Sequence, residues 1–346
     1  MTNLDAHQLT EPVFARIALD WPTRINPWAH EYRHRAARAL RDLGVISADS
    51  GDPNTRAFGG IVVLDAYVYP YSQLERLLAA GTFSQWLFFL DDAYDNHPTV
   101  GRSLECARAL MTSAYELLST GQSAADLSPF ERLTLYLRRQ LEELGPRGWM
   151  PRFLGHVRDY LFRGSLAAVA HWSNGTVPAT LEYLELRMHD SAVFPALDMV
   201  EIAASIDLPE DVLRHPTLLE MGRATVRHTA YVNDLFSYQK EVLWSGTPCN
   251  LVHVLMHNEK LDFRQAVDLV IDMVNADAVR FGELETSRPR WRADIERAVE
   301  SYITGMKAWM RGNIDFSLAS LRYRAPDSPF VELRAPAVAL DTAVMD

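Results

Sequence analysis

The apolar residues of this chain recur with the period of an α-helix over most of its length. In the first such stretch they form one stripe, made by Trp28, Tyr32, Ala36, Leu40 and Leu43. Gly44 follows this stripe and is well suited to cap the helix at its carboxyl end. The same period returns in the segments 101–121, 130–144, 150–172, 214–243, 261–284 and 289–311. A pattern of this kind favours packed helices over any sheet.

Some short apolar runs, such as residues 59–69, are compatible with strands, but no regular succession of β-branched runs and hairpin turns accompanies them. The chain has 346 residues, of which 48% are hydrophobic and 23% are charged, so it can bury a large core. We therefore expect an all-α fold of roughly ten to twelve helices, in a single domain over residues 1–346. The tails, residues 1–25 and 325–346, are expected to be less ordered.

The formal net charge of −11 argues against two classes of partner. Nucleic acids and anionic membranes both favour a basic surface, and an anionic substrate would need local cations or metal ions. The two cysteines, Cys106 and Cys249, have no paired spacing, which suits a reducing compartment. The first residues show no signal peptide, and no apolar run is long enough to cross a membrane. We expect a cytoplasmic protein without a membrane span.

Three aspartates end an aromatic-rich apolar segment in the stretch "WLFFLDDAYDNHP", residues 86–98. On a helix Asp91 and Asp95 share a face, with Asp92 beside them. Three like charges so close together destabilise the helix unless a cation joins them. A solvated helix end would look the same in isolation, but the preceding apolar run places these carboxylates at the rim of a core. This context favours a cation site.

A second polar constellation lies in "YVNDLFSYQKEVLW", residues 231–244. Asn233, Ser237 and Glu241 are spaced by four and eight residues, so they share one helix face. Their amide, hydroxyl and carboxylate oxygens are hard ligands that suit Mg²⁺ better than Zn²⁺. A merely polar helix face is the alternative. Two oxygen-rich faces on separate helices together indicate a diphosphate bound through metal ions.

The motifs "DDAYD" and "NDLFSYQKE" resemble the DDxxD and NDxxSxxKE motifs of the bacterial class I terpene synthases (terpene cyclases). A third segment, "TVPATLEYLELRMHDSA", resembles the family segment that carries a diphosphate-sensing arginine, here Arg187, which lies 46 residues before Asn233. A fourth, "AWMRGNIDFSLASLRY", resembles the closing segment and ends in Arg322 and Tyr323. The resemblance extends from about residue 27 to residue 323. It implies the α-helical bundle of the class I terpenoid synthases.

The resemblance also implies roles for individual residues. Mg²⁺ ions, three per site and replaceable by Mn²⁺, would be held by Asp91, Asp92, Asp95, Asn233, Ser237 and Glu241. Arg187 would sense the diphosphate, Asp190 would act as the linker, and Ser191 would be the effector at a helix break where glycine is commoner. Lys240, Arg322 and Tyr323 would bind the diphosphate with Arg187 and Asn233.

Aromatic side chains would line the pocket in which a carbocation is held. The candidates are Phe88, about one turn before Asp91, with Trp309 and Phe316 on the closing segment, where a tryptophan is usual in place of Phe316. Phe89 and Trp86 are expected to face the core instead, because an aromatic residue on an apolar helix more often serves packing than function.

The function implied is that of a class I terpene cyclase, a lyase that ionises farnesyl diphosphate, or geranylgeranyl diphosphate, and cyclises the carbocation to a hydrocarbon or an alcohol. By analogy with the family the enzyme would be a homodimer. Two alternatives stay open. A chain-elongating prenyltransferase shares the fold and the first DDxxD motif, but it carries a second aspartate-rich motif where this chain has "NDLFSYQKE". An acidic helical scaffold without catalytic activity is the other.

Overall fold

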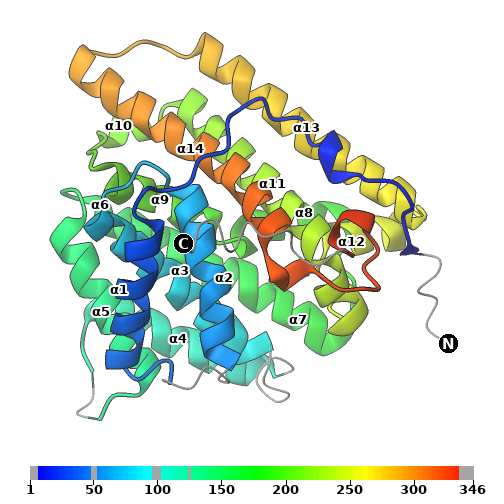
Figure 1. Ribbon diagram of the computed structural model, residues 1–346, viewed down its shortest axis with the longest axis horizontal. Coiled ribbons are helices and arrows are strands. Elements are labelled where there is room, and N and C mark those ends of the chain that lie inside the picture. The colour runs from blue at the N-terminus through cyan, green and yellow to red at the C-terminus, as the bar shows by residue number, and fades with distance from the viewer. Residues whose placement is uncertain (1–6, 48–52, 96–102, 124–125, 335–346) are drawn as a thin grey trace.

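A computed structural model describes residues 7–47, 53–95, 103–123 and 126–334, and these ranges form helices and loops without a β-strand (Figure 1). The prediction of an all-α fold is therefore confirmed, and the apolar run 59–69 lies almost wholly within a helix. The α-helices in chain order are α1 (Ala29–Asp42), α2 (Pro53–Val68), α3 (Leu74–Asp95), α4 (Leu104–Thr120), α5 (Pro129–Leu144), α6 (Trp149–Asp159), α7 (Leu166–Asn174), α8 (Thr180–Asp190), α9 (Val193–Ala204), α10 (Glu210–Leu213), α11 (Pro216–Tyr238), α12 (Leu251–Asn258), α13 (Phe263–Ser287) and α14 (Ala293–Ala319).

Two π-helical turns interrupt this series. The turn η3 (Tyr160–Ser165) joins α6 to α7, and η4 (Gln239–Trp244) continues α11. The 3-10 turns are η2 (Phe14–Arg16), η5 (Leu321–Tyr323) and η6 (Val331–Leu333). Among the described helices, none combines the length and the apolar character needed to span a bilayer.

Local sequence signals set several helix ends. Helix α5 begins with a capping box in which Ser128 and Glu131 each accept a hydrogen bond from the other's backbone N–H. Helix α1 ends just before Gly44, whose φ of 71° is the left-handed conformation that glycine adopts without a steric penalty. The predicted stripe of α1 is buried at its centre, although Trp28 at its start is 43% exposed.

Helix α11 packs against more of the other helices than most: it contacts α13 and α14, and also α8, α9 and α12. Figure 1 shows α13 and α14 as two long helices, joined by a loop at one end, with the N-terminal segment running across them. On the other side of the bundle α3 packs between α2, α5 and α9. The helices α2, α3, α9, α11 and α14 thereby surround one cavity.

The two terminal segments pack against each other, which differs from the expectation of less ordered tails. The N–H of Leu9 donates to the carbonyl of Pro329 at 2.8 Å, and the N–H of Phe14 donates to the carboxylate of Glu332 at 2.9 Å. Phe14 also stacks on Phe236 of α11, with ring centroids 3.9 Å apart. The apolar residues of these segments follow no helical period, so no local sequence pattern indicates this packing. Residues 1–6 and 335–346 lie outside the described ranges.

One buried carboxylate holds the N-terminal helices together. Asp65 of α2 is 0% exposed and accepts a hydrogen bond from the hydroxyl of Tyr32 on α1. Gln85 of α3 in turn donates to that hydroxyl at 3.4 Å. Burial raises the pKa of Asp65 to about 7, although hydrogen bonds from Ser84 and Tyr32 act in the opposite direction.

Replacement of Asp65 by asparagine should therefore change how stability depends on pH. Because the pKa is raised in the folded state, folding takes up a proton at Asp65, and this contribution to stability is lost as the pH rises from about 4 toward 7. The unfolding free energy of Asp65→Asn, measured relative to that of wild type, should therefore rise by on the order of 2 kcal/mol when the pH is raised from about 5.5 to about 8.

Chemical denaturation at the two pH values measures this gain. Asp42→Asn, whose side chain is 72% exposed, is the matched control and should show no such change. A pH-independent difference between Asp65→Asn and wild type would contradict the raised pKa.

Candidate active site

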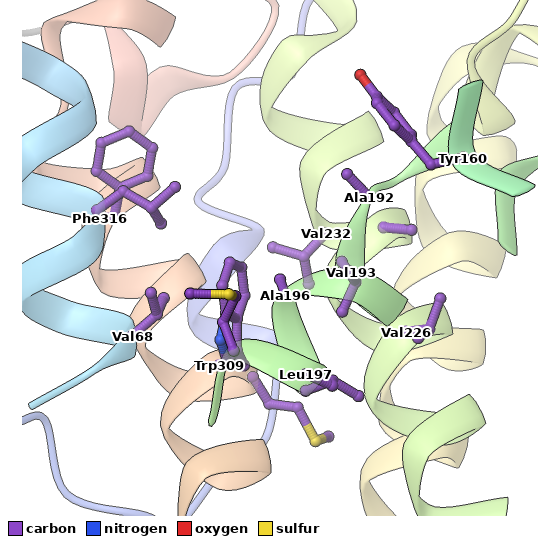
Figure 2. Close-up of a cluster of buried hydrophobic side chains, with 14 of the residues drawn as sticks. Val68, Tyr160, Ala192, Val193, Ala196, Leu197, Val226, Val232, Trp309 and Phe316 are labelled. Atoms are coloured by element: carbon purple, nitrogen blue, oxygen red, sulfur yellow. The ribbon is translucent and has the colours of Figure 1, made fainter. Parts of the chain in front are cut away.

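The cavity has a volume of about 250 Å³ and is apolar in its depth. Its walls include Ala192, Val193 and Ala196 at the start of α9, with Trp309 and Phe316 on α14. Figure 2 shows these side chains on facing elements, with Tyr160 of η3 toward one end. An apolar cavity of this kind suits a hydrocarbon ligand, because binding removes the apolar surface of both the ligand and the cavity from water.

Polar residues gather at the mouth of this cavity. Asp91 at the end of α3 lines it together with Asn233 and Ser237 of α11 and Glu241 of η4. The structure thus brings the first residue of the DDxxD motif to the same cavity as all three residues of the second constellation. The side chains of Asp92 and Asp95 lie outside the part that the structure describes.

The oxygen atoms at this mouth fit a divalent cation. Ser237 is 2% exposed, and its hydroxyl oxygen makes no hydrogen bond of normal geometry. Burial raises the pKa of Glu241, and the nearby Asp234 carboxylate raises it further, while Arg187, Asn250 and Ser237 oppose the rise. A cation would satisfy the hydroxyl and favour the ionised carboxylate. In the described residues no three His, Cys, Asp or Glu side chains form a group that could hold a metal ion. Within this part of the chain the oxygen ligands at the mouth therefore include the amide of Asn233 and the hydroxyl of Ser237.

Arg187 lies beside the second constellation. Its Nε donates to Oδ1 of Asp234 at 2.8 Å, and its Nη2 donates to Oδ1 of Asn233 at 2.8 Å. Its Nη1 is 3.8 Å from Oδ2 of Asp190. Burial disfavours the charge on this guanidinium, but Asp234 and the other anionic neighbours outweigh it and raise the pKa of Arg187. Arg187 therefore carries a full positive charge at the cavity mouth.

The expected helix break follows directly after Asp190. Helix α8 ends at Asp190, and α9 begins at Val193. The left-handed residue at the break is Ala192, with a φ of 55°, rather than Ser191. The hydroxyl of Ser191 accepts from the N–H of Val193 at 3.3 Å. Both Asp190 and Ser191 line the cavity.

The remaining diphosphate candidates also lie at the mouth. Lys240, Arg322 and Tyr323 line the cavity. The hydroxyl of Tyr323 accepts from Nδ2 of Asn233 at 3.1 Å, which connects the closing segment to α11. The guanidinium of Arg322 lies 5.1 Å from the ring centroid of Phe88.

The aromatic candidates fall into two groups. Phe88, Trp309 and Phe316 line the cavity. Trp86 is fully buried in the core, where its Nε1 donates to the hydroxyl of Thr134 at 2.9 Å. Phe89 packs against the core and is absent from the described cavity lining.

Several residues that shape the site have no counterpart in the sequence predictions. Asn250 is fully buried and donates through Nδ2 both to the carboxylate of Glu241 at 3.1 Å and to the carbonyl of Asp234 at 2.9 Å. Its place before the apolar run of α12 is a helix N-cap signal, which predicts its backbone role but not its contact with Glu241. The two π-helical turns both border the cavity, and no sequence pattern indicates them.

Comparisons with known proteins agree with this geometry. The model of terpene synthase family 2, described as C-terminal metal binding, matches residues 82–279. The 10-epi-cubebol synthase of Sorangium cellulosum is 30% identical over 310 residues, 88% of this chain and 96% of that protein. A (+)-T-muurolol synthase of Roseiflexus castenholzii, named as farnesyl diphosphate cyclizing, is 30% identical over 75% of this chain and 79% of its own length. The crystal structure of germacradien-4-ol synthase from Streptomyces citricolor superposes with a TM-score of 0.74 at 25% identity, covering 87% of this chain and 97% of that one.

The backbone contact between η3 and the end of α8 yields a stability prediction. A Cβ added at Gly164 would lie 2.4 Å from the backbone nitrogen of Asp190, which is closer than atoms can approach. Gly164→Ala should therefore push the two segments apart and lower the unfolding free energy by about 1–3 kcal/mol, as overpacking does. Gly155→Ala is the matched control, because nothing lies within 4 Å of its added Cβ.

Denaturant unfolding of both variants measures the difference. If Gly164→Ala is as stable as Gly155→Ala, then η3 and α8 are not in the close contact described.

Proposed function

The chain belongs to the terpene synthase family and is a class I terpene cyclase, and from this premise we propose that it ionises farnesyl diphosphate at the cavity described above. The allylic carbocation would be cyclised to a terpene hydrocarbon or alcohol, with release of diphosphate. The observation that carries this proposal is the meeting of Asp91, Asn233, Ser237 and Glu241 at the mouth of one apolar cavity.

The names of two relatives support a C15 substrate over a C20 one. The synthase of Roseiflexus castenholzii and a 4-epi-cubebol synthase of Streptosporangium roseum are both named as cyclizing farnesyl diphosphate.

Metal ions would be held by Asp91, Asn233, Ser237 and Glu241, with Asp92 and Asp95 completing the first motif. The family is a metal-binding one, and the oxygen-only ligand set supports Mg²⁺, three ions in our proposal, with Mn²⁺ as a substitute. When bound, the ions supply Lewis-acid neutralisation of the leaving diphosphate.

The protein's own cations would complete the neutralisation. Arg187, whose guanidinium is fixed by Asp234, presents a planar group that can donate to two diphosphate oxygens. Lys240, Arg322 and Tyr323 would bind the diphosphate from the other parts of the rim. Asp190 and Ser191 connect Arg187 to the helix break, so a shift of Arg187 toward the diphosphate would move the start of α9.

The depth of the cavity would hold the carbocation away from solvent. Aromatic ring faces attract positive charge by about 0.5–2 kcal/mol each, and the aromatic residues Phe88, Trp309 and Phe316 line the cavity.

The two alternatives receive no support from the molecule. A second aspartate-rich motif would place further carboxylates where Asn233 and Ser237 stand, and the named relatives are cyclizing synthases. A scaffold would not need a buried arginine at the mouth of an apolar cavity. Assembly as a homodimer and a cytoplasmic location stay predictions.

Loss of one proposed metal ligand should abolish turnover. Glu241→Gln keeps the shape of the side chain but removes its charge, which unbalances an octahedral Mg²⁺ site. Diphosphate release from farnesyl diphosphate should become undetectable, and Mg²⁺ with diphosphate should no longer raise the melting temperature. Glu185→Gln, at a side chain that is 71% exposed, is the matched control. Full activity of Glu241→Gln would exclude Glu241 as a metal ligand.

The geometry of Arg187 can be separated from its charge. Arg187→Lys keeps the positive charge but loses the planar arrangement of donors. If that arrangement positions the diphosphate, kcat should fall by about 10²-fold, the scale for loss of a positioned electrostatic donor. Steady-state kinetics measures this, with Arg163→Lys at a half-exposed ion pair as the control. A rate near that of wild type would reduce Arg187 to a general cation.

A further inference from the structure

A buried hydroxyl lies on the cavity wall below the proposed metal ligands. Thr229 of α11 is four residues before Asn233 and eight before Ser237, so it lies on the same helix face. At a rise of about 1.5 Å per residue, it is about 6 Å deeper than Asn233 along the helix. Thr229 is 4% exposed and lines the cavity, and its Oγ1 has no hydrogen-bond partner.

Other helical threonines in this protein behave differently. The hydroxyls of six of them donate to the carbonyl four residues earlier, and these are Thr82, Thr120, Thr134, Thr225, Thr286 and Thr304. Thr225 is the closest comparison, because it lies one turn before Thr229 on the same helix and donates to Met221 at 3.0 Å. Thr229 makes no such bond, so its hydroxyl is available to a ligand in the cavity.

A second polar side chain reaches the same place from the facing helix. Asn313 of α14 is 6% exposed and lines the cavity. Its Nδ2 donates to the backbone carbonyl of Thr229 at 3.2 Å, which fixes the amide beside the threonine. A hydroxyl and a carboxamide therefore lie together at a depth where the walls are otherwise formed by residues such as Ala196 and Ala230.

The prenyl chain of the proposed substrate has no polar atom to pair with these groups. Buried polar groups nevertheless find hydrogen-bond partners, and a water molecule needs two to four of them in a polar recess. We propose that Thr229 and Asn313 bind one water molecule that captures the final carbocation, so that the enzyme releases a terpene alcohol. This inference rests on the proposed function.

The chemistry of the step balances without any further reactant. A lone pair of the water oxygen forms the new C–O bond to the cationic carbon, and the resulting oxonium loses one proton. That proton ends on the diphosphate that the same turnover releases. When the water donates a hydrogen bond to Thr229 or Asn313, a lone pair of the water oxygen remains directed into the cavity. The two residues thereby act as specificity determinants between alcohol and hydrocarbon.

The test compares products of wild type, Thr229→Val and Asn313→Leu after incubation with farnesyl diphosphate and Mg²⁺. Valine keeps the shape of threonine and removes only the hydroxyl. We expect wild type to give mainly an alcohol that takes up ¹⁸O from labelled water. In each variant the alcohol-to-hydrocarbon ratio should fall by about tenfold, the effect of losing one buried hydrogen bond. Diphosphate release should continue in both variants.

Thr225→Val is the matched control, because its hydroxyl is bonded within the helix and it is not among the cavity-lining residues. Its product ratio should equal that of wild type. A wild-type product that is only hydrocarbon, or an unchanged ratio in both cavity variants, would overturn the water site while leaving the cyclase function intact. Absence of diphosphate release from wild type would instead refute the proposed function.

A crystal structure of wild type with Mg²⁺ and diphosphate tests the site without turnover. Electron density for a water molecule within hydrogen-bond distance of Thr229 Oγ1 and the Asn313 amide is expected. The same region should lack that density in Thr229→Val. An empty recess in the wild-type crystal would overturn the inference.

Discussion

The mouth of the cavity depends on one buried carboxylate, that of Asp234. It is fully buried and accepts hydrogen bonds from Nε of Arg187, from the hydroxyl of Tyr183 at 2.7 Å and from the backbone N–H of Leu251 at 2.9 Å. These contacts join α8, α11 and the start of α12. Burial raises the pKa of Asp234, and the Arg187 charge opposes that rise more than any other group. A charge pair buried in this way is costly to break, because removal of one partner leaves the other uncompensated.

Helix α11 carries both halves of the cavity along a single face. Thr229 lies in the apolar depth, Asn233 and Ser237 lie at the mouth, and the π-helical turn η4 presents Glu241 beyond them. A diphosphate and a hydrocarbon have opposite requirements, since one needs cations and the other needs the absence of water. One helix meets both requirements because its face runs from the rim of the core into its interior.

The sequence motifs predicted the rim of the site better than its supports. Asp91 and the second constellation could be identified because each motif has a period that can be read along one helix. Asn250 and Tyr183 could not be identified in this way, because their contacts with Glu241 and Asp234 join residues that are 9 and 51 positions apart. The packing of the N-terminal segment could not be predicted from a local pattern either, since Leu9 and Phe14 form hydrogen bonds with residues more than 300 positions away.

The sequence by itself determined the helical content, the order of the motifs and the chemical class of the rim. These features are local, because hydrophobic period and ligand spacing act within a few turns of one helix. Only the tertiary structure decided which side of α3 faces the cavity, so that Phe88 lines it while Trp86 fills the core. It also decided that the Thr229 hydroxyl lies beside Asn313 of α14 rather than bonded within its own helix. Such choices depend on which helices pack together, and that is set by the sum of many weak contacts between distant segments.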